Sequence, residues 1–186
     1  MNSNKHKVLI LSGGMGRRYG IPKALAKYKG ETFLDIIVNK CLSLNLDVYV
    51  VLNQQVNNMF IDKRKFTSII GDSNKDMYNS VLRGIKAIGD FSKLIIWPVD
   101  HPFVSANTIQ DLLTASNKNK FLVPSYLGKL GHPVMFPSSA LEFVQQCHNL
   151  KELIKLFGRI ILQVNDNGIL LNINKKEDIP QNEQLL

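Results

Sequence analysis

A glycine-rich loop directly after a short apolar run constrains this chain more than any other feature of its sequence. The run Val8–Leu11 is typical of a β-strand, and four glycines follow it: Gly13, Gly14, Gly16 and Gly20. Glycine adopts positive φ angles and lets backbone N–H groups come close to a ligand. Successive N–H groups in such a loop can form an anion-binding concavity. The pattern predicts a polyphosphate cradle at the end of the first strand.

The charges of this loop favour the same interpretation. It carries Arg17, Arg18 and Lys23 and contains no acidic residue. Guanidinium and ammonium groups donate hydrogen bonds that suit phosphate oxygens. A tight strand-to-helix turn with a solvated basic face remains the alternative.

Two well-known glycine loops are excluded by spacing. A P-loop needs Gly-Lys followed by Ser or Thr, whereas Ile21 and Pro22 separate Gly20 from Lys23. A dinucleotide-binding fingerprint needs the spacing G-x-G-x-x-G. Counted from Gly14, its third glycine would fall at Tyr19.

The segment Gly14–Leu25 resembles the signature loop of the MobA-like nucleotidyltransferases. It reads Gly-Met-Gly-Arg-Arg-Tyr-Gly-Ile-Pro-Lys-Ala-Leu. The family includes molybdenum cofactor guanylyl- and cytidylyltransferases, with sugar-phosphate and methylerythritol-phosphate cytidylyltransferases as more distant relatives. The resemblance implies a Mg²⁺-dependent enzyme that transfers a nucleoside monophosphate from an NTP to a phosphorylated acceptor and releases pyrophosphate.

The composition fits one globular domain, residues 1–186, with a substantial core. Hydrophobic residues make up 45% of the chain and charged residues 20%. No apolar run approaches the ~20 residues that span a bilayer, and the run after Lys7 is too short for a signal peptide. Cys41 and Cys147 lack metal-site spacing. We expect a reduced, cytoplasmic protein without a membrane partner.

The net charge of +8 is compatible with two kinds of anionic partner. A basic surface can bind nucleic acid, or it can steer a polyanionic small molecule such as an NTP. The first 30 residues hold seven Lys and Arg and no Asp or Glu, and the remaining excess is scattered. This distribution favours the NTP, and a nucleic-acid binder is the less favoured alternative.

Strand-like and helix-like segments alternate along the chain. Strands are expected at 8–11, 48–52, 68–70, 94–99, 121–123, 134–136, 160–164 and 169–173, and helices at 33–42, 54–60, 76–88, 106–113, 138–146 and 149–157. Alternation predicts an α/β fold with a largely parallel sheet. With the resemblance, the expected fold is a three-layer α/β/α sandwich, the Rossmann-like nucleotide-diphospho-sugar transferase fold.

Three local signals refine these boundaries. Thr32 and Ser105 have the residue type and position of helix N-caps. Asn165–Gly168 is a hairpin-turn signal, so the strands at 160–164 and 169–173 are expected to pair with each other.

Asp100 is the candidate metal ligand. It directly follows the most apolar strand, and ligands of parallel sheets bind beyond the carboxyl ends of the strands. Mg²⁺ takes oxygen ligands, few from protein and several from phosphates and water. A turn residue before Pro102 is the alternative. The segment Asp100–Pro102 also resembles the Asp-x-Pro metal motif of the family.

Two further segments match the family in part. In Asp76–Gly84, Met77 and Ser80 match a stretch that opens a helix near the nucleotide base, although Asp76 replaces a glycine. Gly131–Val134 resembles a segment of the molybdenum cofactor cytidylyltransferases that lies near the acceptor. Ser80 and His132 are therefore candidate binding residues, and purely structural roles remain open for both.

A late segment departs from the family pattern. Asn172 and Asn174 stand where two aspartates are expected. An asparagine supplies only a neutral oxygen to a metal. A second metal contact is then weaker or comes from elsewhere.

The resemblance implies a role for each remaining loop residue. The N–H groups of Gly13, Gly14 and Gly16 would hold the β- and γ-phosphates, and Leu11 and Ser12 would line the nucleotide site. Arg18 would stabilise the leaving pyrophosphate, and Lys23 would contact the α-phosphate. Asp100 would place Mg²⁺ between nucleotide and acceptor.

The base and the acceptor stay open at this stage. Ser12–Gly14 resembles the guanylyltransferases, whereas Gly131–Pro133 resembles the cytidylyltransferases. We expect GTP or CTP, with molybdopterin as the leading acceptor and a sugar or polyol phosphate as the alternative. A partner to which the product is handed over is part of this expectation. A nucleotide-binding module that has lost catalysis is a further alternative, suggested by Asn172 and Asn174.

Overall fold

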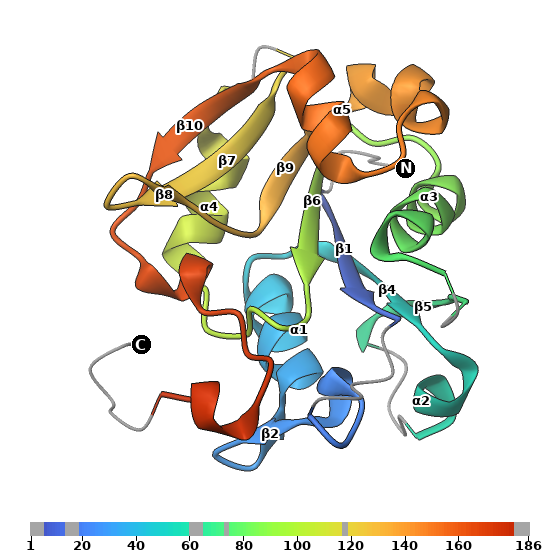
Figure 1. Cartoon of the computed structure of the whole chain (residues 1–186), viewed down its shortest axis with the longest axis vertical. Helices are drawn as coiled ribbons and strands as arrows, with labels where there is room; N and C mark the ends of the chain where they lie inside the picture. The colour runs from blue at the N-terminus through green and yellow to red at the C-terminus, as the bar shows by residue number, and fades with distance from the viewer. Residues whose placement is uncertain (1–5, 14–18, 60–64, 73–74, 117–118, 181–186) are drawn as a thin grey trace.

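The computed structural model describes residues 6–13, 19–59, 65–72, 75–116 and 119–180. These residues form a sheet of eight strands in the order β10-β7-β9-β6-β1-β4-β5, with β8 paired to β7 (Figure 1). The strands are β1 (Lys7–Ser12), β4 (Asp47–Leu52), β5 (Thr67–Ile70), β6 (Lys93–Pro98), β7 (Phe121–Tyr126), β8 (Lys129–Leu130), β9 (Val134–Pro137) and β10 (Arg159–Gln163). A small separate hairpin pairs β2 (Lys27–Tyr28) with β3 (Glu31–Thr32).

Helical elements connect most of the strands. The α-helices are α1 (Phe33–Ser43), α2 (Gln54–Met59), α3 (Met77–Ile88), α4 (Ala106–Thr114) and α5 (Leu150–Phe157). The 3₁₀ helices are η1 (Lys23–Leu25), η3 (Ser138–Gln146), η4 (Asn167–Leu170) and η5 (Lys176–Asp178).

The sheet is mostly parallel, as predicted. β1 pairs in parallel with β4 and β6, β4 with β5, and β7 with β10. β9 runs antiparallel between β6 and β7. Because β1 and β6 are parallel neighbours, their carboxyl ends meet at one edge, where Leu11 stands opposite Pro98. The segments that follow these two strands therefore start side by side.

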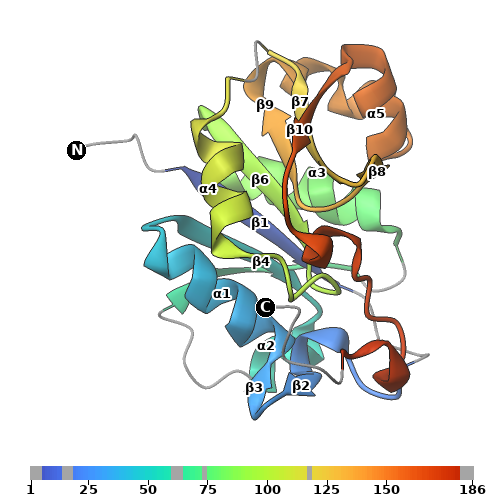
Figure 2. The same ribbon diagram turned by 90° about the vertical axis from the view of Figure 1, so that its left-hand side faces the viewer.

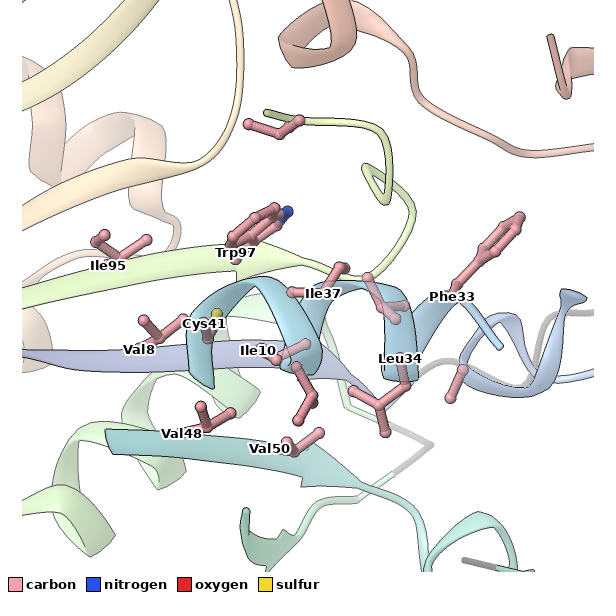
Figure 3. Close-up of a cluster of buried hydrophobic side chains, with 14 of the residues drawn as sticks. Val8, Ile10, Phe33, Leu34, Ile37, Cys41, Val48, Val50, Ile95 and Trp97 are labelled. Atoms are coloured by element: carbon pink, nitrogen blue, oxygen red, sulfur yellow. The ribbon is translucent and has the colours of Figure 1, made fainter. Parts of the chain in front are cut away.

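Helices cover both faces of the sheet, which confirms the three-layer architecture. α1 and α4 lie on one face, and α3 and α5 lie on the other (Figure 2). Side chains of β1 alternate between the two cores: Val8 and Ile10 belong to one, and Leu9 and Leu11 belong to the other. In Figure 3 the apolar side of α1, including Ile37 and Cys41, lies over β1, β4 and β6.

Helix starts follow the local sequence signals. The Thr32 hydroxyl accepts a hydrogen bond from Asp35 N at 3.0 Å, and the Ser105 hydroxyl accepts one from Thr108 N at 3.2 Å. Both predicted caps are confirmed. Asp76 caps α3 in the same way, accepting from Asn79 N at 2.8 Å.

A glycine brings α3 close to β1. A Cβ on Gly84 would lie 2.3 Å from Cδ2 of Leu9, a separation that would force a shift. The missing side chain lets the helix pack directly on the strand that leads into the glycine loop. The N-terminus of α3 is thereby held beside the end of β1.

The predicted hairpin at Asn165–Gly168 is wrong. β10 pairs in parallel with β7, and residues 167–170 form η4 in place of a strand. The Asp166 carboxylate accepts from Gly168 N at 2.9 Å and from Ser105 N at 2.8 Å, which turns the chain toward α4. Ile169 and Ile173 are fully buried in the core, and this burial outweighs strand pairing.

In the described residues, no helix combines the length and apolarity needed to cross a bilayer.

Candidate functional site

A cavity of about 230 Å³ opens at the edge where β1 and β6 end. It lies where the sequence predicts a site, beyond the carboxyl ends of parallel strands. Its described lining comes from the end of β1, η1, the loop between β5 and α3, the start of α3 and the end of β6: Leu11, Ser12, Gly13, Lys23, Asp72, Lys75, Asp76, Met77, Ser80, Pro98, Val99 and Asp100.

Lys23 connects three parts of the chain that are far apart in the sequence. Its ammonium group lies 2.9 Å from Oδ2 of Asp100 and donates a 2.8 Å hydrogen bond to Oδ1 of Asn174. The side chains of Lys23 and Asp100 are 20% and 23% exposed, so the ion pair is partly shielded but open to a ligand. The positive charge is therefore held in one place at the mouth of the cavity.

A backbone hydrogen bond holds the segment Asn172–Asn174 beside Lys23. Ile173 N donates to the carbonyl of Asp100 at 2.8 Å, which places the next residue, Asn174, beside Lys23. The Asn174 amide also donates to Oδ1 of Asn172 at 3.0 Å, which fixes its orientation. Figure 1 shows this segment passing from β10 beyond the end of β6 to the lower part of the molecule. Both asparagines thus form part of the candidate site.

The two oxygens of the Asp100 carboxylate have different surroundings. Oδ2 accepts from Lys23, whereas Oδ1 is buried without a hydrogen-bond partner among the described residues. A buried carboxylate oxygen without a partner is costly, and a hard cation would satisfy it. Asp100 is therefore suited to coordinate Mg²⁺. The described residues contain no cluster of three or more His, Cys, Asp or Glu side chains that could hold a metal alone, so phosphate oxygens and water would complete the coordination.

A buried histidine, His101, and a half-buried one, His132, lie next to Asp100. The rings of His101 and His132 are 5.0 Å apart, and Nε2 of His101 is 3.9 Å from Oδ1 of Asp100. Burial, with smaller contributions from His132 and Lys23, lowers the pKa of His101 to about 4 against the opposing effect of Asp100. Burial also lowers the pKa of His132. Both rings are neutral at pH 7, so they add no cation beside Lys23.

Gly13 and Ser80 face each other across the cavity wall. A Cβ on Gly13 would lie 3.3 Å from Oγ of Ser80, which is tighter than an ordinary contact. Glycine at this position keeps the loop backbone close to the first turn of α3. The buried Ser80 hydroxyl and the loop backbone thus line the same wall.

His132 lines a second cavity of about 650 Å³. This cavity lies between α5 and the strands β7 to β10, and Met77 lines both cavities. The N-terminal end of α3 therefore separates the two cavities.

The structure gathers most of the predicted site residues. Leu11, Ser12, Gly13, Lys23, Ser80 and Asp100 line the first cavity, and His132 lines the second. Gly14, Gly16 and Arg18 lie outside the described residues, so their predicted roles stay predictions.

Sequence reasoning missed several lining residues. Asp72 and Lys75 belong to the loop after β5, whereas Met77, which opens α3, already matched the family pattern in the sequence. Asp72 follows the carboxyl end of a parallel strand, which is the signal that identified Asp100. Because the strand expected at 68–70 is short, the sequence alone does not draw attention to the equivalence between Asp72 and Asp100.

Comparisons with known proteins agree with this geometry. The sequence profile of the MobA-like NTP transferase domain matches residues 8–164. A probable molybdenum cofactor guanylyltransferase of Bacillus cereus (strain AH187) is 27% identical over 96% of this chain and 96% of its own length.

Solved structures show the same fold at lower identity. Rv0371c from Mycobacterium tuberculosis superposes with a TM-score of 0.80 at 18% identity, covering 96% of both chains, and it has also been solved in complex with manganese. The 4-diphosphocytidyl-2C-methyl-D-erythritol synthase of Anaerococcus prevotii gives a TM-score of 0.78 at 13% identity, covering 95% of both chains. The nucleotide-diphospho-sugar transferase fold expected from the sequence is confirmed.

Proposed function

The chain belongs to the MobA-like NTP transferase family, and from this premise we propose that it transfers GMP from GTP to the phosphate of a molybdopterin acceptor. Pyrophosphate is the second product. The contact of Lys23 with both Asp100 and Asn174 carries the proposal, because it gathers a cation and the carboxylate predicted to bind a metal beside the end of β1. The guanylyltransferase names of the relatives support GTP as the donor.

The proposed reaction is a displacement at phosphorus. An oxygen of the acceptor phosphate forms a bond to the α-phosphorus of GTP, and the bond from that phosphorus to the bridging β-phosphate oxygen breaks. Phosphoryl-type transfer requires positioning and charge neutralisation more than covalent participation by the protein. This requirement matches a site whose described lining includes Lys23, Asp100, Ser80 and the backbone of Gly13.

Each residue has a distinct part in this proposal. Lys23 neutralises the charge that develops on the α-phosphate oxygens, and Asn174 holds its ammonium group in place. The backbone of Gly13 and the hydroxyl of Ser80 bind the triphosphate from the same wall of the cavity. Asp100 would hold Mg²⁺ through its unpartnered Oδ1, and the bound ion would neutralise the charge of the triphosphate. The manganese complex of Rv0371c supports a divalent ion in this fold.

Asp72 is the candidate for base recognition. Asp72 lies in the loop between β5 and α3 and brings a carboxylate to the wall of the cavity. The Watson–Crick edge of guanine offers adjacent N–H donors, which a carboxylate can accept together. Asp72→Asn replaces one acceptor by a donor. We expect a KM for GTP at least about ten-fold higher, since a hydrogen bond to a charged group contributes roughly 1.5–3 kcal/mol.

The test is a matrix of donors and acceptors. The purified protein with Mg²⁺ is incubated with GTP, CTP, ATP or UTP and with molybdopterin or a panel of sugar phosphates, and pyrophosphate is measured. Release with GTP and molybdopterin is the expected result. Release with CTP and a sugar phosphate alone would contradict both the donor and the acceptor.

Thermal melting separates the remaining outcomes. A raised Tm with an NTP but no pyrophosphate would indicate a binding module without catalysis. No change in Tm with any NTP would refute the assignment of the glycine loop.

Lys27→Met is the matched control for Lys23 variants, because Lys27 is exposed and outside the first cavity.

A further inference from the structure

An exposed turn near the end of the described chain carries Asn174. On one side of it, Ile173 is fully buried, and its N–H donates to the Asp100 carbonyl at 2.8 Å. On the other side, the half-buried Ile179 packs against the core. Between these two anchors, η5 contains no buried residue. The hydrogen bonds within the turn therefore determine its shape.

The carboxylate of Asp178 closes this turn. Its Oδ2 accepts hydrogen bonds from Asn174 N and from Lys175 N, each 2.8 Å long. The backbone N–H of Asp178 donates to the Lys175 carbonyl at 3.2 Å. The same two N–H donors hold the pKa of the Asp178 carboxyl below its ordinary value, with smaller contributions from the charges of Lys175 and Lys23. Asp178 is therefore a charged acceptor at pH 7.

Asp178 is linked to Lys23 through a single residue. The backbone N–H of Asn174 donates to Asp178, and the side-chain Oδ1 of Asn174 accepts from the Lys23 ammonium group at 2.8 Å. That ammonium group lies 2.9 Å from Oδ2 of Asp100. A continuous series of contacts thus runs from the exposed turn to the carboxylate in the first cavity.

The exposure of Asp178 indicates where its hydrogen bonds matter. Hydrogen bonds to an exposed group contribute little to the free energy of unfolding, because water can replace them. The same bonds restrict the backbone at Asn174 and Lys175, which would otherwise sample several conformations. The consequence of losing them is therefore expected at the Lys23 ammonium group and not in the Tm.

We propose that Asp178 is a positioning residue for Lys23, and that it acts by folding the turn that presents Asn174 to the ammonium group. The consequence for the reaction rate rests on the proposed function, whereas the consequence for the place of the ammonium group does not. Because Asp178 acts through Asn174, losing its carboxylate costs no more activity than losing the Asn174 side chain.

Two variants of Asp178 test the effect on the rate. Asp178→Ala removes the acceptor, and we expect kcat to fall about three- to ten-fold, with the KM for GTP within about two-fold of wild type. Asp178→Asn keeps an oxygen that can accept both N–H groups, and its kcat is expected within about two-fold of wild type. In the Asn174→Ala background, Asp178→Ala has no further effect on kcat.

Glu177→Gln is the matched control. It removes the neighbouring exposed charge of η5 and leaves both hydrogen bonds to Asp178 in place. We expect wild-type kcat and KM in this variant. A loss in Glu177→Gln or in Asp178→Asn equal to that in Asp178→Ala would assign the effect to charge and overturn the inference. A wild-type kcat in Asp178→Ala would overturn it as well.

Labelling of lysines measures the place of the ammonium group without the reaction. Trace acetylation with acetic anhydride and mass spectrometry of peptides give the reactivity of Lys23 relative to the exposed Lys27. The ammonium group of Lys23 is paired and its side chain is 20% exposed, so in wild type it reacts more slowly than Lys27. The ratio of the two rises at least about two-fold in Asp178→Ala and in Asn174→Ala. It stays at the wild-type value in Asp178→Asn and in Glu177→Gln.

The labelling ratio separates failure of this inference from failure of the proposed function. If wild type releases no pyrophosphate, the proposed function fails, and a higher ratio in Asp178→Ala still supports the positioning of Lys23. An unchanged ratio in Asp178→Ala overturns the inference whatever the activity. Pyrophosphate release by wild type then leaves the proposed function intact.

Discussion

Replacing Lys23 and Asn174 separately and together tests whether they act as one unit. Lys23→Met removes the ammonium group but keeps most of the side-chain volume. Loss of one donor that stabilises transition-state charge typically costs about 10²–10³ in kcat. Because the ion pair with Asp100 is partly exposed, it contributes only about 1 kcal/mol or less to the free energy of unfolding. The Tm of this variant is therefore expected to fall by no more than about 4 °C.

Asn174→Ala removes one of the two oxygens that hold the ammonium group. The hydrogen bond is 2.8 Å long and half-buried, and the ion pair with Asp100 remains. A bond of this kind contributes roughly 1.5 kcal/mol, the lower end for a charged group. This corresponds to a fall in kcat of about ten-fold.

The double variant distinguishes coupling from independence. If Asn174 acts through Lys23, the double variant has the same loss of about 10²–10³ in kcat as Lys23→Met alone. Independent contributions would multiply to a loss of about 10³–10⁴. The assay is pyrophosphate release at saturating GTP and acceptor, with Lys27→Met as control. Additive losses would refute the assigned role of Asn174, and near-normal turnover of Lys23→Met would refute that of Lys23.

Three further predictions concern stability and reactivity. Thr32→Ala removes the cap of α1 and lowers the free energy of unfolding by about 1 kcal/mol, which urea denaturation measures; Thr32→Ser retains most of the stability, and equal losses in both variants would contradict the capping role. Gly168→Ala would place a Cβ 2.3 Å from the carbonyl oxygen of Phe103, and we expect a loss of about 1–3 kcal/mol in the same assay, an unchanged midpoint being the opposing result. Burial raises the pKa of the Cys41 thiol to about 12, so a thiol reagent at pH 8 modifies the half-buried Cys147 in the native protein and Cys41 only in denaturant; mass spectrometry of labelled peptides checks this, and native labelling of Cys41 would contradict it.

The first strand and the parallel character of the sheet could be predicted because their signals are local. Apolar runs that alternate with amphipathic segments determine layer and strand type, and the caps at Thr32 and Ser105 depend on residues three positions away. The carboxyl edge of such a sheet is the expected place for a ligand. The sequence therefore predicts Asp100 and Lys23 in one site, and the structure places them 2.9 Å apart.

The region after β10 could not be predicted correctly from local signals. Asn165–Gly168 has the composition of a hairpin turn, but Asp166 caps the turn toward α4, and Ile169 and Ile173 are buried in the core. Hydrogen bonds and burial that involve distant elements outweighed the local preference.

The sequence by itself determined the family resemblance and the layered fold, and it predicted a phosphate-binding loop after β1. Only the tertiary structure showed that Asn174 holds Lys23, that Asp100 has one unpartnered oxygen, and that a second cavity lies beyond His132. The physical reason is the separation along the chain: Lys23 and Asn174 are 151 positions apart. Contacts between such residues depend on how the layers pack, and no periodicity or short motif in the sequence encodes that packing.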